Sequence, residues 1–148
     1  MAKAENAVDL TSRASFNHWT PVTIRFSDQD PLGHVNNVAV GAYVEVCRTQ
    51  LIHKALLREK YPDLNFALVH LEIDYKAEFR YPGTIDVGGR IDRIGTKSFS
   101  SSYGLFLDDT CVATAGSINV FFDTSQRAGV EPPDDVRALI EKIMADQP

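Results

Sequence analysis

The side chains best suited to chemistry gather in one short stretch, residues 28–37 (DQDPLGHVNN). Residues 30–33 (DPLG) predict a β-turn, because Asp favours its first position, Pro fixes φ at the second and Gly suits the fourth. The Asn36-Asn37 pair that follows is typical of a helix N-cap. We therefore expect Asp30 just ahead of the positive end of a helix. A charged carboxylate is stabilised there, and free backbone N–H groups can bind a developing oxyanion.

A strand and a helix must position this stretch. Residues 19–27 alternate apolar and polar side chains, which predicts a half-buried strand that leads into the turn. The apolar segment after the turn predicts a helix from about Asn37 to Lys60 that stops before Pro62. In its first half apolar side chains cover most of the circumference, so this helix should be buried.

Three residues inside the predicted helix carry further expectations. Gly41 lowers helix stability, so a closely packed neighbour is the expected reason for its presence. Glu45 and Arg48 lie one turn apart, and the simplest interpretation is a local ion pair.

Beyond Pro62 the pattern changes to the period of β-strands. The expected strands span residues 66–79, 84–94, 97–107 and 110–122. The last three are joined by short turns and predict an antiparallel meander, with a bulge at Gly88-Gly89. A short amphipathic helix should follow Pro133. This order fits a sheet with one long helix on its concave face.

Length and composition limit the possible classes. A chain of 148 residues with 44% hydrophobic residues indicates one domain with a real core. We expect a flexible tail over residues 1–17 and a single domain over residues 18–148. The net charge of −5, with no Lys/Arg run, argues against nucleic-acid binding and against binding to anionic membranes. With no apolar core of a signal peptide and no membrane-spanning run, the sequence predicts a soluble cytoplasmic protein.

The cysteines and serines do not indicate a covalent mechanism. Cys47 and Cys111 stand apart, without Cys-x-x-Cys or Cys/His ligand spacing, which is typical of buried thiols in a reducing compartment and predicts no metal site. No Ser lies in a Gly-x-Ser-x-Gly turn. A covalent Ser or Cys mechanism is therefore disfavoured.

The turn and the helix together resemble a known family. Residues 26–37 (FSDQDPLGHVNN), followed by Tyr43, Glu45 and Arg48, are similar to the hotdog-fold acyl-CoA thioesterases, in particular the 4-hydroxybenzoyl-CoA thioesterase-like family. The order of elements agrees over residues 19–122. The resemblance implies an α+β hotdog fold, in which an antiparallel β-sheet wraps around one long central α-helix, here with a short C-terminal helix.

The resemblance also implies an activity. It implies hydrolysis of an acyl-CoA thioester to free acid and CoA by a homodimer, often paired into a homotetramer, with active sites across the dimer interface. It gives Asp30 the role of catalytic carboxylate and gives the backbone N–H of Asn37 the role of polarising the carbonyl. CoA would be part of the substrate, so no cofactor is expected. The Gly-His-Val-Asn-Asn loop departs from the aromatic-rich loop of the hydroxybenzoyl enzyme, which argues against a 4-hydroxybenzoyl substrate.

Several roles stay open at this point. Asp30 can attack the carbonyl as a nucleophile or deprotonate a water as a general base. His34 is a candidate for orienting substrate or water, whereas Asp28 is expected to be structural. Four basic residues are candidates for contacts to CoA phosphates or are simply solvated: Arg80, Arg90, Arg93 and Lys97.

Other functions stay open as well. An acyl-carrier-protein thioesterase would use the same chemistry on a protein-bound substrate. A non-catalytic acyl-CoA-binding hotdog module would have no need of a carboxylate beside the acyl group. A hotdog dehydratase would need an Asp/His pair acting on a β-hydroxyl, which the turn position of Asp30 fits less well.

Overall fold

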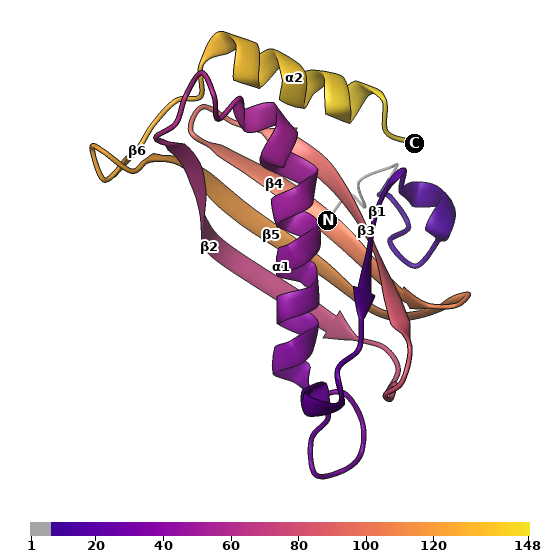
Figure 1. Ribbon diagram of the computed structural model, residues 1–148. Helices are drawn as coiled ribbons and strands as arrows, with labels where there is room; N and C mark the ends of the chain where they lie inside the picture. The colour runs from indigo at the N-terminus through magenta and orange to yellow at the C-terminus, as the bar shows by residue number, and fades with distance from the viewer. Residues whose placement is uncertain (1–6) are drawn as a thin grey trace, which may run out of the picture.

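A curved antiparallel sheet holds one long helix against its concave face in the computed structural model, which describes residues 7–148 (Figure 1). The strands are β1 (His18–Thr23), β2 (Leu64–Tyr75), β3 (Thr84–Ile94), β4 (Ser98–Leu107), β5 (Thr110–Asp123) and β6 (Ala128–Gly129). The α-helices are α1 (Asn37–His53) and α2 (Asp134–Ala145), and three 3-10 turns are η1 (Arg13–Ser15), η2 (Phe26–Asp28) and η3 (Lys54–Leu56). The predicted hotdog architecture, with its short C-terminal helix, is confirmed.

The sheet has the strand order β1-β3-β4-β5-β2, and every pair of neighbours is antiparallel. The predicted meander corresponds to β3-β4-β5. Strand β2 follows α1 in sequence but lies at one edge of the sheet, where among residues 7–148 it pairs with β5 alone. The short strand β1 forms the other edge, and β6 adds two residues to β5.

Helix α1 is buried along the side that faces the sheet, where Val44 and Cys47 have no exposed surface. The prediction that this helix continues to Lys60 is wrong. The α-helix ends at His53, one 3-10 turn follows, and Leu57 has a left-handed backbone with φ of 50°. Apolar residues continue past His53 because Ala55 and Leu56 are buried in a separate core cluster that also holds α2. Because these two buried residues are apolar, the sequence shows the apolar pattern of a longer helix than the structure contains.

The glycines of β3 serve packing and do not form the predicted bulge. The ladder runs regularly through Gly88 and Gly89, and the irregularity falls between Ile91 and Arg93. A Cβ on Gly88 would lie 2.6 Å from the ring of Phe16, on the convex face of the sheet. A Cβ on Gly89 would lie 2.7 Å from Cys47 Sγ, on the helix side. The missing side chains allow close packing on both faces of the sheet.

Gly41 has no equally close neighbour within the chain. A Cβ there would meet Ile73 Cδ1 at 3.9 Å, which is an ordinary contact. The expected close partner is therefore absent among residues 7–148, although the contact shows that Gly41 lies on the side of α1 that faces β2.

Residues 7–17 differ from the expected flexible tail, because they pack on the convex face of the sheet. Phe16 is buried and makes edge-to-face contacts with Trp19 and Phe106. Arg13 donates to Asp86 at 2.9 Å and places its guanidinium 4.5 Å from the Trp19 ring centre. Residues 1–6 of the expected tail lie outside the described part of the chain.

The C-terminal residues cover the part of β3 that β1 does not reach. Pairing between β1 and β3 begins at His18 and Gly89. Two residues further along β3, the side-chain amide of Gln147 accepts from the N–H of Ile91 at 2.7 Å and donates to its carbonyl at 2.8 Å. In the described residues, no helix is long and apolar enough to cross a membrane.

Substitution of Gly89 by Ala should destabilise the protein, because the new methyl group cannot fit beside Cys47 without moving α1 away from the sheet. We expect the free energy of unfolding to fall by about 1–3 kcal/mol, measured by urea denaturation. Gly129→Ala is the matched control, since a Cβ there meets its nearest atom at 3.7 Å. Equal stability of the two variants would contradict this account of β3.

Candidate active site

The turn predicted around Asp30 is present in the loop that precedes α1 (Figure 1). The carbonyl of Asp30 accepts from the N–H of Gly33 at 3.0 Å, and its N–H donates to the carbonyl of His34 at 2.9 Å. Gly33 has φ of +83°, a conformation that favours glycine. One carboxylate oxygen of Asp30, Oδ1, accepts from the N–H of Leu32 at 2.9 Å. The second oxygen, Oδ2, remains available for chemistry.

The helix begins where the Asn pair predicted it. Asn36 is the N-cap, and its Oδ1 accepts from the N–H of Ala39 at 2.8 Å. The N–H groups of Asn37 and Val38, in the first turn, have no acceptor inside the helix. The positive end of α1 therefore presents free donors next to the Asp30 turn.

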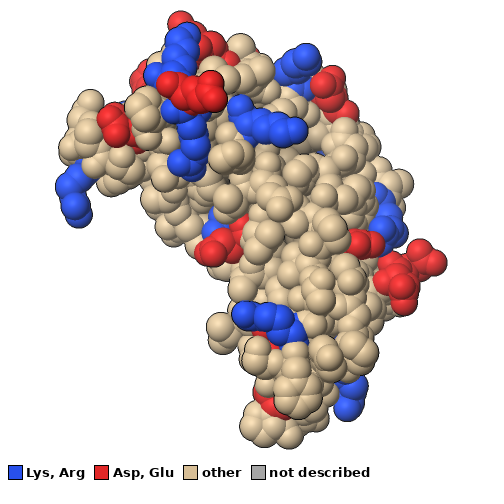
Figure 2. Space-filling model, in the orientation of Figure 1, with Lys and Arg blue, Asp and Glu red and all other residues tan. Residues whose placement is uncertain are grey.

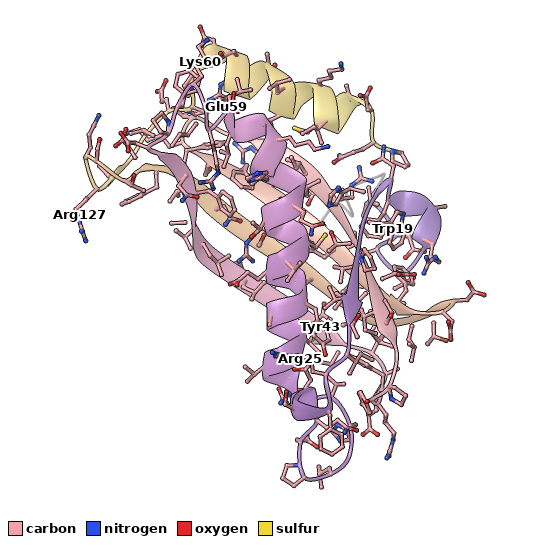
Figure 3. All side chains as sticks on the ribbon, in the orientation of Figure 1. Trp19, Arg25, Tyr43, Glu59, Lys60 and Arg127 are labelled. Atoms are coloured by element: carbon pink, nitrogen blue, oxygen red, sulfur yellow. The ribbon has the colours of Figure 1, made fainter. Side chains whose placement is uncertain are left out.

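Asp28 fixes the loop from inside the protein. Its side chain is 2% exposed, and its Oδ2 accepts from the hydroxyl of Tyr43 at 2.7 Å and from the backbone N–H of Arg25 at 2.9 Å. Its Oδ1 accepts from Nη2 of Arg25 at 2.9 Å, and its carbonyl accepts from the N–H of Asn36 at 3.0 Å. Figure 3 shows Arg25 and Tyr43 close together near the start of α1. The structural role predicted for Asp28 is confirmed.

The charges in this cluster are fixed by their surroundings. Burial alone would raise the pKa of Asp28, but the hydrogen bonds from Tyr43 and Arg25 outweigh it and hold the pKa below its ordinary value. Burial and the neighbouring Asp28 carboxylate raise the pKa of Tyr43. Asp28 is thus a permanent anion at neutral pH and Tyr43 a permanent donor, so this pair anchors the loop and leaves catalysis to other groups.

A pocket of about 270 Å³ opens beside the start of α1. Its wall is formed by residues of the turn, the helix and the segment after β2: His34, Val35, Asn37, Val40, Tyr75, Lys76, Ala77, Glu78, Phe79 and Val112. The hydroxyl of Tyr75 donates to the carbonyl of Asn37 at 3.2 Å, which ties the two sides of the pocket together. Two of the three predicted site residues, His34 and Asn37, therefore share one pocket.

Asp30, the third predicted site residue, reaches this pocket through His34. Its Oδ2 lies 3.6 Å from Nδ1 of His34, and the other ring nitrogen, Nε2, lies 3.8 Å from Oε1 of Glu78. Both Asp30 and His34 are partly exposed, at 26% and 20%. An imidazole between two carboxylates at a pocket wall can orient a substrate or relay a proton.

Sequence reasoning did not identify Glu78. It lies far from the turn in sequence and belongs to an exposed segment after β2 with no recognisable motif. The backbone brings it close, because the N–H of Val35 donates to the carbonyl of Phe79 at 2.8 Å. Only this tertiary contact reveals that the residue before Phe79 faces His34.

Of the four predicted basic residues, Arg80 lies near the turn, because a Cβ on Gly33 would lie 3.3 Å from its Nη1. Lys76, which was not among the four, lines the pocket. Arg90 instead donates to the carbonyls of Ser15 and Pro148. Arg93 and Lys97 belong to the β3-β4 hairpin, which packs against α2 at the end of the sheet opposite the Asp30 turn (Figure 1). Of the predicted basic residues, Arg80 is thus the candidate closest to the Asp30 turn, and Lys76 joins it at the pocket.

The thiols and possible metal ligands do not form a site. Burial raises the pKa of the Cys47 thiol to about 12, so this sulfur stays protonated and unreactive. Burial also raises the pKa of Cys111. Over residues 7–148, no three His, Cys, Asp or Glu side chains are grouped to hold a metal ion.

Substitution of Asp28 by Asn should destabilise the protein in a pH-dependent way. Because the folded-state pKa of Asp28 is lowered, its contribution is fully present above the ordinary value of about 3.9 and is lost as pH falls through the folded value. We expect Asp28→Asn to cost about 1–3 kcal/mol at pH 7 in urea unfolding. The difference from wild type should shrink below about pH 4. A difference that stays constant from pH 7 to pH 3 would contradict the buried anion.

Comparison with known proteins agrees with the fold. The sequence profile of the Thioesterase-like superfamily matches residues 24–140, which include the turn, α1 and the sheet. No curated protein matches the sequence.

Solved structures share the whole architecture. A Pseudomonas aeruginosa protein is similar at 27% identity and a TM-score of 0.79, over 92% of this chain and 97% of that one. A predicted thioesterase from Bacillus stearothermophilus is 27% identical, with a TM-score of 0.76, over 88% and 97% of the two chains. A Thermus thermophilus thioesterase solved with coenzyme A and Zn is 23% identical, with a TM-score of 0.76, over 90% and 98%. With the superfamily profile matching most of its length, the chain belongs to the Thioesterase-like superfamily, a family of thioester hydrolases.

Proposed function

We propose that this chain hydrolyses an acyl-CoA thioester to a free acid and CoA, with Asp30 as nucleophile or general base and the N–H groups at the start of α1 as oxyanion donors. The observation that carries the proposal is the shared position of these groups. The free Oδ2 of Asp30 contacts His34, and His34 lines the same pocket as Asn37. The coenzyme A bound to the Thermus thermophilus relative supports CoA as the carrier.

The chemistry needs little more than these groups. A thioester carbonyl is weakly stabilised by resonance, and the thiolate is a good leaving group. In one route Asp30 Oδ2 bonds to the carbonyl carbon, the C–S bond breaks and CoA leaves as a thiolate, and water then hydrolyses the mixed anhydride. In the other route Asp30 takes a proton from a water whose oxygen bonds to the carbonyl carbon, and the C–S bond of the resulting tetrahedral intermediate then breaks to release the CoA thiolate and the free acid. In both, the oxyanion is held by an N–H donor such as that of Asn37, which is worth about 3–4 kcal/mol.

His34 supports either route. Its Nδ1 faces Asp30 and its Nε2 faces the exposed Glu78, so the ring lies between two carboxylates at the pocket wall. We assign it the positioning of the attacking water or of the thioester carbonyl.

We further propose that the working unit is a homodimer joined through β2, with no cofactor. In the described part of the chain, strand β2 (Leu64–Tyr75) has a neighbouring strand on one side alone, so the backbone groups along its outer edge can pair with another strand. Leu68 and Val69 on this strand are 42% and 58% exposed. A long edge strand with exposed apolar side chains readily pairs with another strand. A homotetramer remains an expectation from the family resemblance.

Replacement of Asp30 by Asn should abolish hydrolysis, because the amide can neither attack the carbonyl nor accept a proton. We expect kcat/KM to fall by about 100-fold or more, measured by thiol release with DTNB over acyl-CoAs from acetyl to palmitoyl, plus benzoyl and phenylacetyl. Asp109→Asn, at the exposed turn between β4 and β5, is the matched control and should keep full activity. Retained turnover in Asp30→Asn would reject this role, and tight CoA-ester binding without wild-type turnover would indicate a binding module.

Replacement of His34 by Asn should lower kcat and leave KM nearly unchanged, because the side chain orients reacting groups and contributes little to substrate binding. A loss of up to about 100-fold in kcat is expected for misplaced groups at this distance from the chemistry. The measurement is steady-state hydrolysis of the best acyl-CoA substrate found for the wild type. An increase in KM with kcat unchanged would assign His34 to substrate binding instead.

A further inference from the structure

Gly41 weakens α1, and packing within the polypeptide does not explain its presence. Glycine in a helix interior raises the equilibrium constant for unfolding by about 2- to 5-fold relative to alanine, because it loses more backbone freedom on folding. Outside the helix backbone, a Cβ on Gly41 would meet one atom of the described residues within 4 Å, Ile73 Cδ1 at 3.9 Å. Gly89 is different, since a Cβ there would lie 2.7 Å from Cys47 Sγ. An alanine would fit at Gly41, so the space beside this glycine needs another explanation.

The space beside Gly41 lies next to the candidate active-site pocket. Asn37 lines that pocket and precedes Gly41 by four residues, so both lie on one face of α1, about 6 Å apart along the helix axis. On the opposite wall, Tyr75 lines the pocket, and Ile73 lies two residues earlier on the same face of β2. The Tyr75 hydroxyl bonds to the Asn37 carbonyl, and Ile73 contacts Gly41. Both walls of the pocket therefore continue past Asn37 and reach Gly41.

The surface beyond Asn37 is apolar over a limited length. Residues 38–44 contain no charged side chain, so the first charge on α1 beyond Asn37 is that of Glu45. The Glu45 carboxylate lies 3.6 Å from Nη2 of Arg48, which confirms the ion pair expected from the sequence. On the β2 side, Ile73 packs against the main core cluster. Figure 2 shows that the middle of the face carrying α1 is mostly uncharged. The apolar stretch from Asn37 to Glu45 measures about 12 Å along the helix.

The two sides of the pocket suit different parts of a thioester substrate. Lys76 and Glu78 make one side of the lining charged, and they offer no apolar contact to an acyl chain. The side toward Gly41 offers apolar surface. Each methylene group that leaves water there gains about 4-fold in affinity. With its carbonyl at the N–H of Asn37, an acyl chain therefore gains most by extending along α1 toward Gly41.

We propose that Gly41 determines which acyl groups the site accepts, because its missing side chain leaves room between α1 and β2 for an unbranched acyl chain of medium length. The inference rests on the proposed hydrolysis and names its substrate class. The acyl chain passes Asn37, lies over Gly41 in contact with Ile73, and ends before the carboxylate of Glu45. The helix loses stability at Gly41, and the site gains the space that a medium-length acyl group needs.

The first test compares stability with acyl selectivity in Gly41→Ala and Gly41→Leu. Thiol release gives kcat/KM for acetyl-, butyryl-, octanoyl- and palmitoyl-CoA. The ratio of the octanoyl value to the acetyl value should fall by about 10-fold in Gly41→Ala and further in Gly41→Leu. Gly41→Ala should also lower the equilibrium constant for unfolding in urea by about 2- to 5-fold, because alanine favours the helix. Ala42→Leu, at the exposed neighbouring position, is the matched control and should keep the wild-type ratio. A wild-type ratio in both Gly41 variants would overturn the proposal.

The same variants distinguish an acyl chain beside Gly41 from a second protein molecule packed there. If a second molecule fills the space, Gly41→Leu should weaken assembly in sedimentation velocity and lower the turnover of acetyl-CoA and octanoyl-CoA by the same factor. An equal loss on both substrates would overturn the inference. A loss that is selective for octanoyl-CoA supports it, because assembly alone does not distinguish one acyl length from another.

A binding experiment decides the inference if the wild type hydrolyses no acyl-CoA. The probes are the thioethers S-ethyl-, S-butyl- and S-octyl-CoA, which cannot be hydrolysed, and their affinities are measured by isothermal titration calorimetry. Affinity for the wild type should rise from S-ethyl-CoA to S-octyl-CoA, and Gly41→Leu should remove most of this rise. That result without turnover would reject the proposed hydrolysis and leave this inference standing. No binding of any thioether, or a rise that Gly41→Leu leaves unchanged, would overturn the inference.

Discussion

The buried carboxylate of Asp28 is the contact on which the arrangement of the site depends. It connects the end of β1, through Arg25, to the second turn of α1, through Tyr43, and its carbonyl holds the N-cap residue. The loop between these elements therefore has a fixed base, and Asp30 projects from it two residues later. Asp28 and Asp30 therefore have different roles. The carboxylate of Asp28 is buried and fully hydrogen-bonded, whereas the carboxylate of Asp30 keeps a free oxygen.

Local interactions explain why the start of the site was predictable. The Asp30 turn depends on the preferences of Asp, Pro and Gly at consecutive positions, and the helix start depends on a side chain that bonds three residues ahead. The order of helices and strands could also be predicted from the sequence, because apolar residues recur with different periods in helices and in strands. Both kinds of information lie within a few residues of sequence.

What the sequence did not reveal depends on contacts between distant segments. The end of α1 was misplaced because Leu56 is buried by α2 and so continues the apolar pattern of the helix. The role of Gly88 depends on Phe16, and the environment of His34 depends on Glu78. In each case the residue type is compatible with several structures, and the choice between them is made by a neighbour that comes close only in the folded chain.

The side-chain amide of Gln147 on Ile91 has a consequence for how the protein can associate. It acts as a one-residue strand and occupies the backbone groups of β3 beyond the end of β1. The outer strand on this side, β1, is short and contains Pro21, which cannot donate a ladder hydrogen bond. The two edges of the sheet are therefore unlike, with one protected and one open. Pairing through the open edge stops at two molecules. Once the β2 strands of two copies pair, both open edges are covered, and the protected edges that remain cannot add further copies to form a filament.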